Sequence, residues 1–108
     1  MPHQIDTSLV IKDYQGKEMV KTFQAGEDPG PVTIRKLIQF AMTAPMEGDD
    51  RVEFKKKFQW HQIAEKAENP IVEYSAQDTT IILERGSKVF TALVFGRLKE
   101  AIDPEPKS

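Results

Sequence analysis

Prolines divide this chain into segments that no single helix or strand can cross. Two of its seven prolines, Pro29 and Pro31, lie with two glycines and two acidic residues in residues 24–31, which is the composition of a loop. Pro45 and Pro70 mark two further breaks. Because proline lacks a backbone N–H and clashes with the preceding helical turn, it is rare inside helices and central strands. The sequence therefore predicts an N-terminal region followed by separate elements between these breaks.

The N-terminal region alternates apolar and polar residues as a half-buried strand does. Alternate positions share one face, occupied by Ile5, Thr7, Leu9 and Ile11. A polar break containing Gly16, whose backbone can adopt a positive φ, separates this segment from a short extended pattern in residues 19–23. We therefore expect residues 5–23 to form a β-hairpin.

Residues 33–44 predict the first helix. Thr33 is a favourable N-cap, and Val32 and Leu37 are spaced for a hydrophobic staple across the helix start. Apolar residues recur at the spacing of one helix face, at Ile34, Leu37, Ile38, Ala41 and Met42. Pro45 ends the segment. We expect this helix to lie against the core along that face.

A second helix is predicted over residues 50–68, because Asp50 and Glu53 match the capping-box pattern and Pro70 follows the end. A rotation of about 100° per residue places apolar residues on one side, at Val52, Trp60, Ile63 and Ala67. Phe54 and Phe58 fall on another side and need a second cover. The hairpin is the expected cover, and another molecule is the alternative.

The remainder of the chain permits two interpretations. Residues 70–74 suit a connector or a short strand, and Ser75 with Asp78 predicts a helix start. In residues 79–95, β-branched and aromatic residues on either side of Gly86 favour a second hairpin. Apolar residues at helical spacing in the same stretch favour helices instead. The residues alone do not decide between the two.

Short motifs between residues 72 and 98 match a pattern known from other proteins. They are Val72-Glu73, Ser75-Ala76-Gln77-Asp78, Ile82-Leu83, Lys88-Val89-Phe90 and Leu93-Val94-Phe95-Gly96-Arg97-Leu98. In these motifs the chain resembles a group of small proteins encoded by tailed bacteriophages and prophages. Those relatives have Val-Gly-Lys where this chain has Gly86-Ser87-Lys88, and a proline in place of Ala92. A proline there is typical of the first turn of a helix, so the resemblance implies two helices with a break near Thr91. The group has no established activity, and the resemblance implies a phage origin without a mechanism.

These predictions combine into a small α+β protein. The 108 residues, 39% of them hydrophobic, are enough for one core and too few for a second domain. We expect an N-terminal β-hairpin packed on a bundle of about four α-helices, as a single domain spanning residues 1–102. Residues 103–108 contain two prolines and no apolar residue, and they are predicted to form a disordered tail.

The residue types that most catalytic and metal sites require are scarce. The chain has no cysteine, which excludes disulfides, thiolate metal sites and cysteine nucleophiles. Its two histidines, His3 and His61, do not make a metal site without converging further ligands. Ser75 and Ser87 lack the Gly-X-Ser-X-Gly pattern of a nucleophile elbow. We therefore predict a protein that is not an enzyme and that needs no metal and no cofactor.

Neither a membrane nor nucleic acid is the expected partner. The N-terminus has no basic head or apolar run typical of a signal peptide, and no apolar stretch is long enough to span a membrane. Fifteen basic and seventeen acidic residues give a formal net charge of −2, so no overall field draws the chain to nucleic acid or anionic lipid. We expect it in the host cell cytoplasm or in the virion.

One local feature departs from this balance, because basic and aromatic residues are mixed in residues 51–60. The three lysines of residues 55–57 stand beside Phe54 and Phe58. Cations mixed with aromatic rings can bind phosphates and stack on bases, but three consecutive lysines spread over about 200° of a helix and cannot all face one partner. If the phenylalanines are uncovered, they form an apolar patch with a basic rim, which is typical of a protein interface. The predicted interaction surface comprises Arg51, Phe54, Lys55, Lys57 and Phe58.

The predicted function is therefore protein binding. We expect a non-enzymatic phage or prophage protein that acts as an accessory or regulatory factor by docking on a host or phage protein. One alternative is a component or assembly factor of the phage particle, for which a homo-oligomer is expected. The other alternative is a weak nucleic-acid-binding accessory protein.

Overall fold

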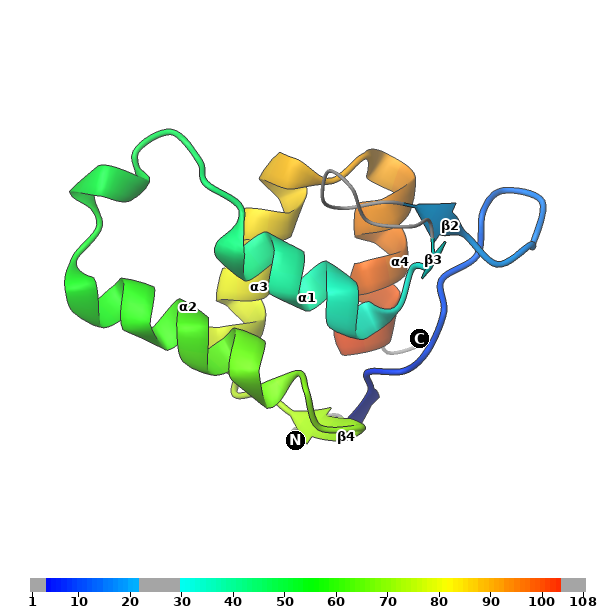
Figure 1. Ribbon diagram of the computed structural model, residues 1–108, viewed down its shortest axis with the longest axis horizontal. Coiled ribbons are helices and arrows are strands. Elements are labelled where there is room, and N and C mark those ends of the chain that lie inside the picture. The colour runs from blue at the N-terminus through cyan, green and yellow to red at the C-terminus, as the bar shows by residue number, and fades with distance from the viewer. Residues whose placement is uncertain (1–3, 22–29, 104–108) are drawn as a thin grey trace, which may run out of the picture.

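Four α-helices and two pairs of short antiparallel strands make up the described part of the chain. The computed structural model describes residues 4–21 and 30–103. The strands are β1 (Gln4–Asp6), β2 (Val20–Lys21), β3 (Gly30–Pro31) and β4 (Ile71–Glu73). The helices are α1 (Ile34–Thr43), α2 (Phe54–Lys66), α3 (Ala76–Val89) and α4 (Ala92–Ile102), with a 3₁₀ turn, η1 (Asp49–Arg51), ahead of α2 (Figure 1). The predicted α+β class and the four helices are confirmed.

The helix α1 lies at the centre of the fold and contacts each of the other three helices (Figure 1). Thr33 caps it, because its side chain accepts a hydrogen bond from the N–H of Lys36 at 3.2 Å. Its buried residues are those predicted to share one face, namely Ile34, Leu37, Ile38, Ala41 and Met42. Burying a large aliphatic side chain contributes about 1.5–3 kcal/mol, so this face is a main source of stability. The prediction for this helix is confirmed.

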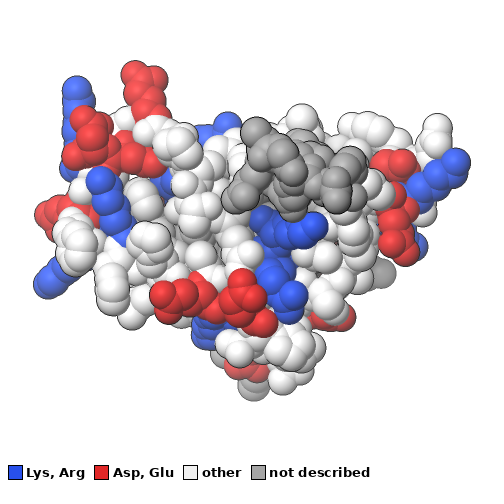
Figure 2. Space-filling view, viewed as in Figure 1, with Lys and Arg blue, Asp and Glu red and all other residues white. Residues whose placement is uncertain are grey.

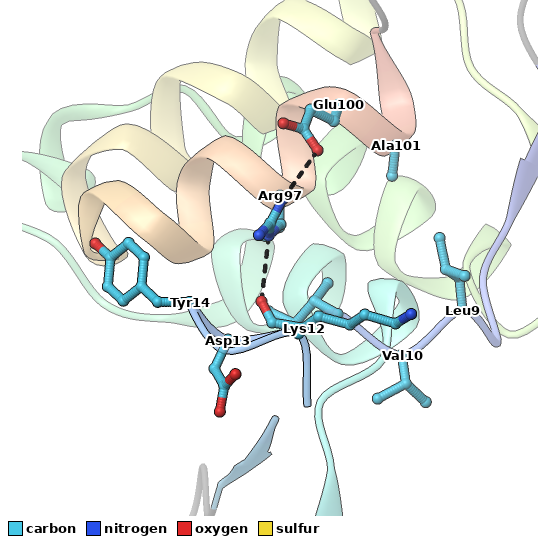
Figure 3. A pocket seen from close by; sticks show the side chains of 10 residues that line it. Leu9, Val10, Lys12, Asp13, Tyr14, Arg97, Glu100 and Ala101 are labelled. Carbon is cyan, nitrogen blue, oxygen red and sulfur yellow. Dashed lines mark hydrogen bonds and ion pairs between the residues drawn. The ribbon is translucent and has the colours of Figure 1, made fainter. Parts of the chain in front are cut away.

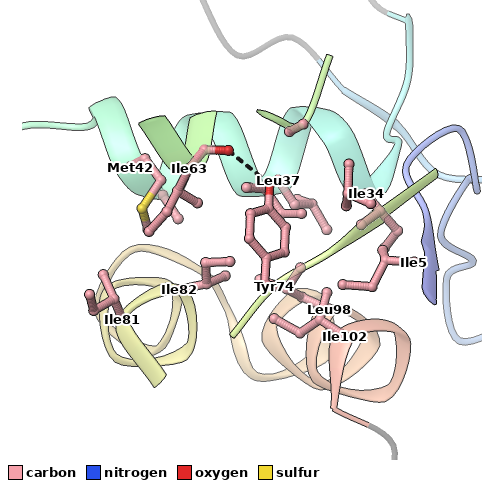
Figure 4. Close-up of a cluster of buried hydrophobic side chains, with 14 of the residues drawn as sticks. Ile5, Ile34, Leu37, Met42, Ile63, Tyr74, Ile81, Ile82, Leu98 and Ile102 are labelled. Carbon is pink, nitrogen blue, oxygen red and sulfur yellow. Dashed lines mark hydrogen bonds between the residues drawn. The ribbon is translucent and has the colours of Figure 1, made fainter. Parts of the chain in front are cut away.

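The core lies where α1 covers α3 and α4 (Figure 4). Leu37 of α1, Ile82 of α3 and Leu98 of α4 are fully buried there. Tyr74, which follows β4, lies among them, and its hydroxyl donates a hydrogen bond to the carbonyl oxygen of Ile63 in α2 at 2.8 Å. Burial raises the pKa of Tyr74 well above its usual range, so the hydroxyl remains a donor at physiological pH.

Two helices, α3 and α4, with a break at Phe90 and Thr91, occupy residues 79–95, so the second-hairpin interpretation is wrong. Ser75 caps α3 as predicted and accepts a hydrogen bond from the N–H of Asp78 at 3.1 Å. Thr91 adopts the extended N-cap conformation of α4, at the predicted break. A Cβ added to Gly86 would lie 3.3 Å from Cδ2 of Leu98, so the glycine allows α3 and α4 to approach closely.

The predicted hairpin over residues 5–23 is wrong as a continuous element. The carboxylate of Asp6 accepts hydrogen bonds from the backbone N–H of Ser8 at 3.0 Å and from its hydroxyl at 2.6 Å. This local turn chemistry competes with strand pairing and ends β1. The strand β1 pairs instead with β4, with Ile5 opposite Val72, and it also contacts α4.

The turn around Gly16 is confirmed, with a φ of 80°. Beyond it, three backbone hydrogen bonds of 2.9 Å run from Met19 N–H to Ile11 O, from Val32 N–H to Met19 O and from Ile11 N–H to Val32 O. These bonds join the segments around Ile11, Met19 and Val32. The second and third of these segments contain the paired strands β2 and β3. Gly30–Pro31, expected in a loop, therefore forms β3. The remainder of that loop and residues 22–23 of the predicted hairpin lie outside the described residues.

The helix α2 begins later than predicted. Residues Asp49–Arg51 form η1, and Glu53 takes the N-cap position of α2 without a side-chain hydrogen bond to the described helix start. The predicted capping box of Asp50 and Glu53 is therefore wrong. The carboxylate of Asp49 accepts hydrogen bonds from Met46 N–H at 2.9 Å and from Arg85, which hold this segment as a separate turn. The predicted tail lies outside the described residues except for Asp103.

Candidate functional site

Phe54 and Phe58 lie exposed on the outward side of α2, with 81% and 53% of their surface accessible. They are one helical turn apart, and their rings stack on each other with centroids 6.2 Å apart and planes at 21°. The turn around Gly16 lies at the opposite end of the molecule from the start of α2 (Figure 1). The expectation that the N-terminal region covers these rings is therefore wrong. The two phenylalanines contact each other and the solvent.

The opposite side of α2 is fixed to the fold. Trp60, Ile63 and Ala67 are buried and Val52 is partly buried, as the predicted face requires. Arg35 of α1 also donates a hydrogen bond to the carbonyl oxygen of Ala67 at 2.8 Å, where α2 ends. The helix therefore presents Phe54 and Phe58 from a rigid support, which favours precise recognition.

Basic side chains flank the phenylalanine pair. By helical rotation, Lys55 and Lys57 lie about 80° to either side of the line through the two rings, whereas Lys56 lies on the opposite side of the helix. Arg51 and Lys55 are exposed, and Lys57 is partly buried. We call the group of five predicted residues the α2 surface, and it comprises Arg51, Phe54, Lys55, Lys57 and Phe58. The structure brings the four helical residues of this group to one side of α2, with Arg51 in η1 just ahead.

The charged side chains at the start of α2 destabilise this helix. The first turn consists of Phe54 and the three lysines of residues 55–57, at the end where the helix dipole is positive. Cations there cost stability, and an anionic partner would offset the cost. Asp50 and Glu53 are also exposed nearby, and Figure 2 shows basic, acidic and uncharged side chains side by side at this end of the molecule. The α2 surface is therefore locally basic without a continuous cationic track.

A groove of about 400 Å³ lies between residues 9–16 and α4 (Figure 3). Arg97 crosses it, since its Nε donates to the carbonyl oxygen of Lys12 at 3.2 Å and its Nη1 lies 3.5 Å from a carboxylate oxygen of Glu100. Leu9 and Tyr14 stand at its edge and are 50% and 83% exposed. The described lining is largely apolar and contains no histidine and no serine. Sequence reasoning missed this groove because its walls are far apart in the chain.

A buried arginine of α3 is the residue that sequence reasoning missed most clearly. Arg85 donates to the carbonyl oxygens of Ala41 and Ala44 at 2.7 Å each, so it satisfies carbonyls at the end of α1. It also pairs with Asp49 at 3.2 Å. This hydrogen bond from Arg85 lowers the pKa of Asp49, which keeps the carboxylate ionised. The sequence did contain a signal for this burial. Arg85 follows Ile81 by four residues, so the two side chains lie on the same buried side of α3.

The other candidate residues do not converge. His61 is exposed on α2, and His3 lies outside the described residues. Ser75 caps α3, and the hydroxyl of Ser87 donates to the carbonyl oxygen of Glu84 at 2.8 Å. Within the described ranges, no group of three or more histidine, cysteine, aspartate or glutamate side chains is placed to hold a metal ion. None of the helices in those ranges combines the length and apolar character that a membrane crossing needs.

Comparison with known proteins finds no match: no protein-family model, no curated protein and no solved structure matches this chain.

Proposed function

We propose that this chain is a non-enzymatic protein-binding domain of phage or prophage origin that docks on a host or phage protein through the α2 surface. The observation that carries the proposal is the exposure of Phe54 and Phe58 as a stacked pair on a rigid helix. Burying each ring against a partner would contribute about 1.5–3 kcal/mol. The phage origin rests on the resemblance of residues 72–98 to small phage proteins.

The chemistry of the α2 surface favours a particular kind of partner. Lys55 and Lys57 flank the rings, and the positive end of the α2 dipole lies beneath them. The complementary surface is an apolar pocket bordered by aspartate or glutamate side chains. In such an interface the aromatic pair supplies most of the affinity, and the charged rim sets specificity and association rate.

A protein fits this surface better than a nucleic acid does. Nucleic-acid binding requires cations that follow a run of phosphates. Here Lys56 lies on the opposite side of the helix from the rings, and Asp50 and Glu53 interrupt the basic residues. The aromatic rings also stack on each other, which occupies faces that would otherwise receive bases.

The test is capture of a partner with a matched pair of double variants. The immobilised chain is exposed to a lysate of the bacterial host, taken with and without phage infection. The Phe54→Ala/Phe58→Ala variant removes residues that are 81% and 53% exposed, and the control Tyr14→Ala/Ile71→Ala removes residues that are 83% and 54% exposed elsewhere. The proposal expects the control to retain the same partner as the unmodified chain, and the phenylalanine variant to lose it. Equal retention by both variants would exclude the α2 surface.

Once a partner is identified, titration with the purified protein measures the effect. Truncating an interface hot spot typically costs about 2 kcal/mol or more, or roughly 30-fold in affinity. We expect at least this loss for the phenylalanine variant. A smaller, salt-sensitive loss of association rate is expected for Lys55→Gln/Lys57→Gln.

The same variants separate the alternatives. If the chain is a homo-oligomer in analytical ultracentrifugation and Phe54→Ala/Phe58→Ala makes it monomeric, then a second copy occupies the surface and a particle component is favoured. If the retained molecule is nucleic acid, binding should fall steeply with salt and be lost on replacing Lys55, Lys56 and Lys57 by glutamate.

A further inference from the structure

A second cavity, of about 230 Å³, lies between residues 46–52, α2 and α3. Three buried residues line it: Trp60, which is 8% exposed, and Ile81 and Arg85, which are each 7% exposed. Lys56 and Lys88 line it as well, and both are exposed. The cavity is on the opposite side of α2 from the phenylalanine pair, since Lys56 lies there by helical rotation. It is therefore separate from the α2 surface.

Trp60 contributes an unused hydrogen-bond donor to this region. Its indole Nε1 is buried and has no acceptor among the described residues. Nearly all buried polar groups in folded proteins are hydrogen-bonded, and an unpaired one costs about 1–3 kcal/mol. The acceptor oxygen of a bound molecule would satisfy this donor.

Arg85 contributes a second donor. A guanidinium carries five N–H groups, and Arg85 uses four of them on Ala41, Ala44 and the two carboxylate oxygens of Asp49. One N–H on Nη1 is left without an acceptor among residues 4–21 and 30–103. The guanidinium carbon lies 3.9 Å from the centre of the Trp60 ring, which places this donor beside the aromatic wall.

The charged residues that line the cavity limit the charge of the ligand that can bind there. Asp49 already neutralises Arg85, and Lys56 and Lys88 form no ion pair within the described part of the chain. Glu47 and Glu84 also line the cavity and are exposed, so they oppose a strongly charged ligand. A single negative charge is therefore better matched than a phosphate dianion. The volume corresponds to roughly eight water molecules and is below the range of about 300–1,000 Å³ for drug-sized ligands.

We propose that this cavity binds a small carboxylate, with the indole N–H of Trp60 and the remaining Nη1 N–H of Arg85 as donors and with Lys56 and Lys88 supplying positive charge. This site does not depend on the proposed protein docking. A carboxylate satisfies several donors at once, because each of its two oxygens can accept more than one hydrogen bond. Hydrogen bonds to such a charged acceptor are about twice as strong as neutral ones.

The test uses the single tryptophan of the chain, which gives one indole N–H signal in a ¹H–¹⁵N correlation spectrum. The isotope-labelled chain is titrated with sodium acetate and sodium succinate, and in parallel with sodium phosphate and sodium chloride at matched ionic strength. We expect a saturable downfield shift of the indole proton with a carboxylate, a weaker response with phosphate and none with chloride. The variant Lys56→Gln/Lys88→Gln should bind the carboxylate at least about tenfold more weakly.

The matched control is Lys17→Gln/Lys55→Gln, which removes the same charge from exposed residues outside this cavity and should leave the carboxylate affinity within about twofold. Both double variants change surface lysines, and urea unfolding verifies that they remain folded. The proposal is overturned if no carboxylate gives a saturable shift, if chloride shifts the indole signal equally, if phosphate binds more tightly than either carboxylate, or if the two lysine variants weaken binding to the same extent.

Discussion

The guanidinium carbon of Arg85 lies 3.9 Å from the centre of the Trp60 ring, so a cation of α3 stacks on an aromatic side chain of α2. The same guanidinium donates to the carbonyl oxygens of Ala41 and Ala44 at the end of α1 and to Asp49 in η1. One side chain therefore links three helices and the segment between α1 and α2. Such an arrangement makes stability depend strongly on a single residue.

Replacing Arg85 by methionine should lower the free energy of unfolding by about 2–4 kcal/mol, because the carbonyl oxygens of Ala41 and Ala44 and the partly exposed Asp49 lose their donor. Arg85→Lys should recover only part of this loss, since an ammonium cannot reproduce the planar fork. Urea unfolding followed by circular dichroism measures both. The control is Arg97→Met, whose exposed ion pair contributes less than about 1 kcal/mol. Equal costs for Arg85→Met and Arg97→Met would contradict the assigned role.

The ion pair between Arg85 and Asp49 should also give the stability a defined pH dependence. Because the pKa of Asp49 is lowered in the folded state by the hydrogen bond from Arg85, its contribution is complete above its unfolded pKa of about 3.9. The contribution is lost as the pH falls through the lower folded pKa. The difference in unfolding free energy between the unmodified chain and Asp49→Asn should therefore be largest near neutral pH and shrink below about pH 4.

Urea unfolding at a series of pH values measures this difference. Asp50→Asn, at the exposed neighbouring residue, is the control and should change stability by less than about 0.5 kcal/mol at every pH. A difference for Asp49→Asn that stays constant or grows towards acid would rule out the ion pair as its cause.

Two glycines in the C-terminal helices should respond differently to alanine. A Cβ on Gly96 would meet no atom of the described residues within 4 Å, so Gly96→Ala should raise the free energy of unfolding by up to about 1 kcal/mol through helix propensity. A Cβ on Gly86 would press on Leu98 at 3.3 Å, and overpacking typically costs about 1–3 kcal/mol. Thermal unfolding should rank Gly96→Ala at least about 1 kcal/mol above Gly86→Ala. The close packing of α3 on α4 is refuted if both variants gain equally.

The Phe54→Ala/Phe58→Ala variant should lose its partner without losing stability. Alanine has the higher helix propensity, by about 0.5 kcal/mol per residue, which offsets the loss of the contact between the rings. We expect the free energy of unfolding to be unchanged or up to about 1 kcal/mol higher. Trp60→Ala, on the buried side of the same helix, should instead cost about 3–5 kcal/mol. If the double variant is destabilised as much as Trp60→Ala, the rings are covered in solution.

Helical faces and caps could be predicted because their signals are local. The apolar face of α1 and the caps at Thr33 and Ser75 depend on residues within one or two turns of each other. In residues 79–95 the local signals did not distinguish helices from a hairpin. There the alternating and helical patterns overlap, and the residues alone did not decide between them.

The N-terminal region shows why the strand pairing and the exposure of the α2 surface could not be predicted. The turn that Asp6 makes with Ser8 changes the alternation, so that Thr7 and Ile11 are buried as predicted while Leu9 is 50% exposed. The partner of β1 lies far along the chain and leaves no local signal. The exposure of Phe54 and Phe58 depends on where this region packs, so residue types identified the α2 surface but could not decide whether it was covered.

The pairing of β1 with β4 has a consequence for the order in which the chain assembles. Thr7 is buried, and its hydroxyl donates to the carbonyl oxygen of Asn69, 62 residues later, at 2.6 Å. During synthesis the first strand is made long before its partner, and such long-range contacts slow folding. A nascent chain that ends before Asn69 has α1 and α2 but leaves Ile5 without its strand partner Val72 and the hydroxyl of Thr7 without its carbonyl acceptors. Translation must therefore pass β4 before β1 can reach its final position.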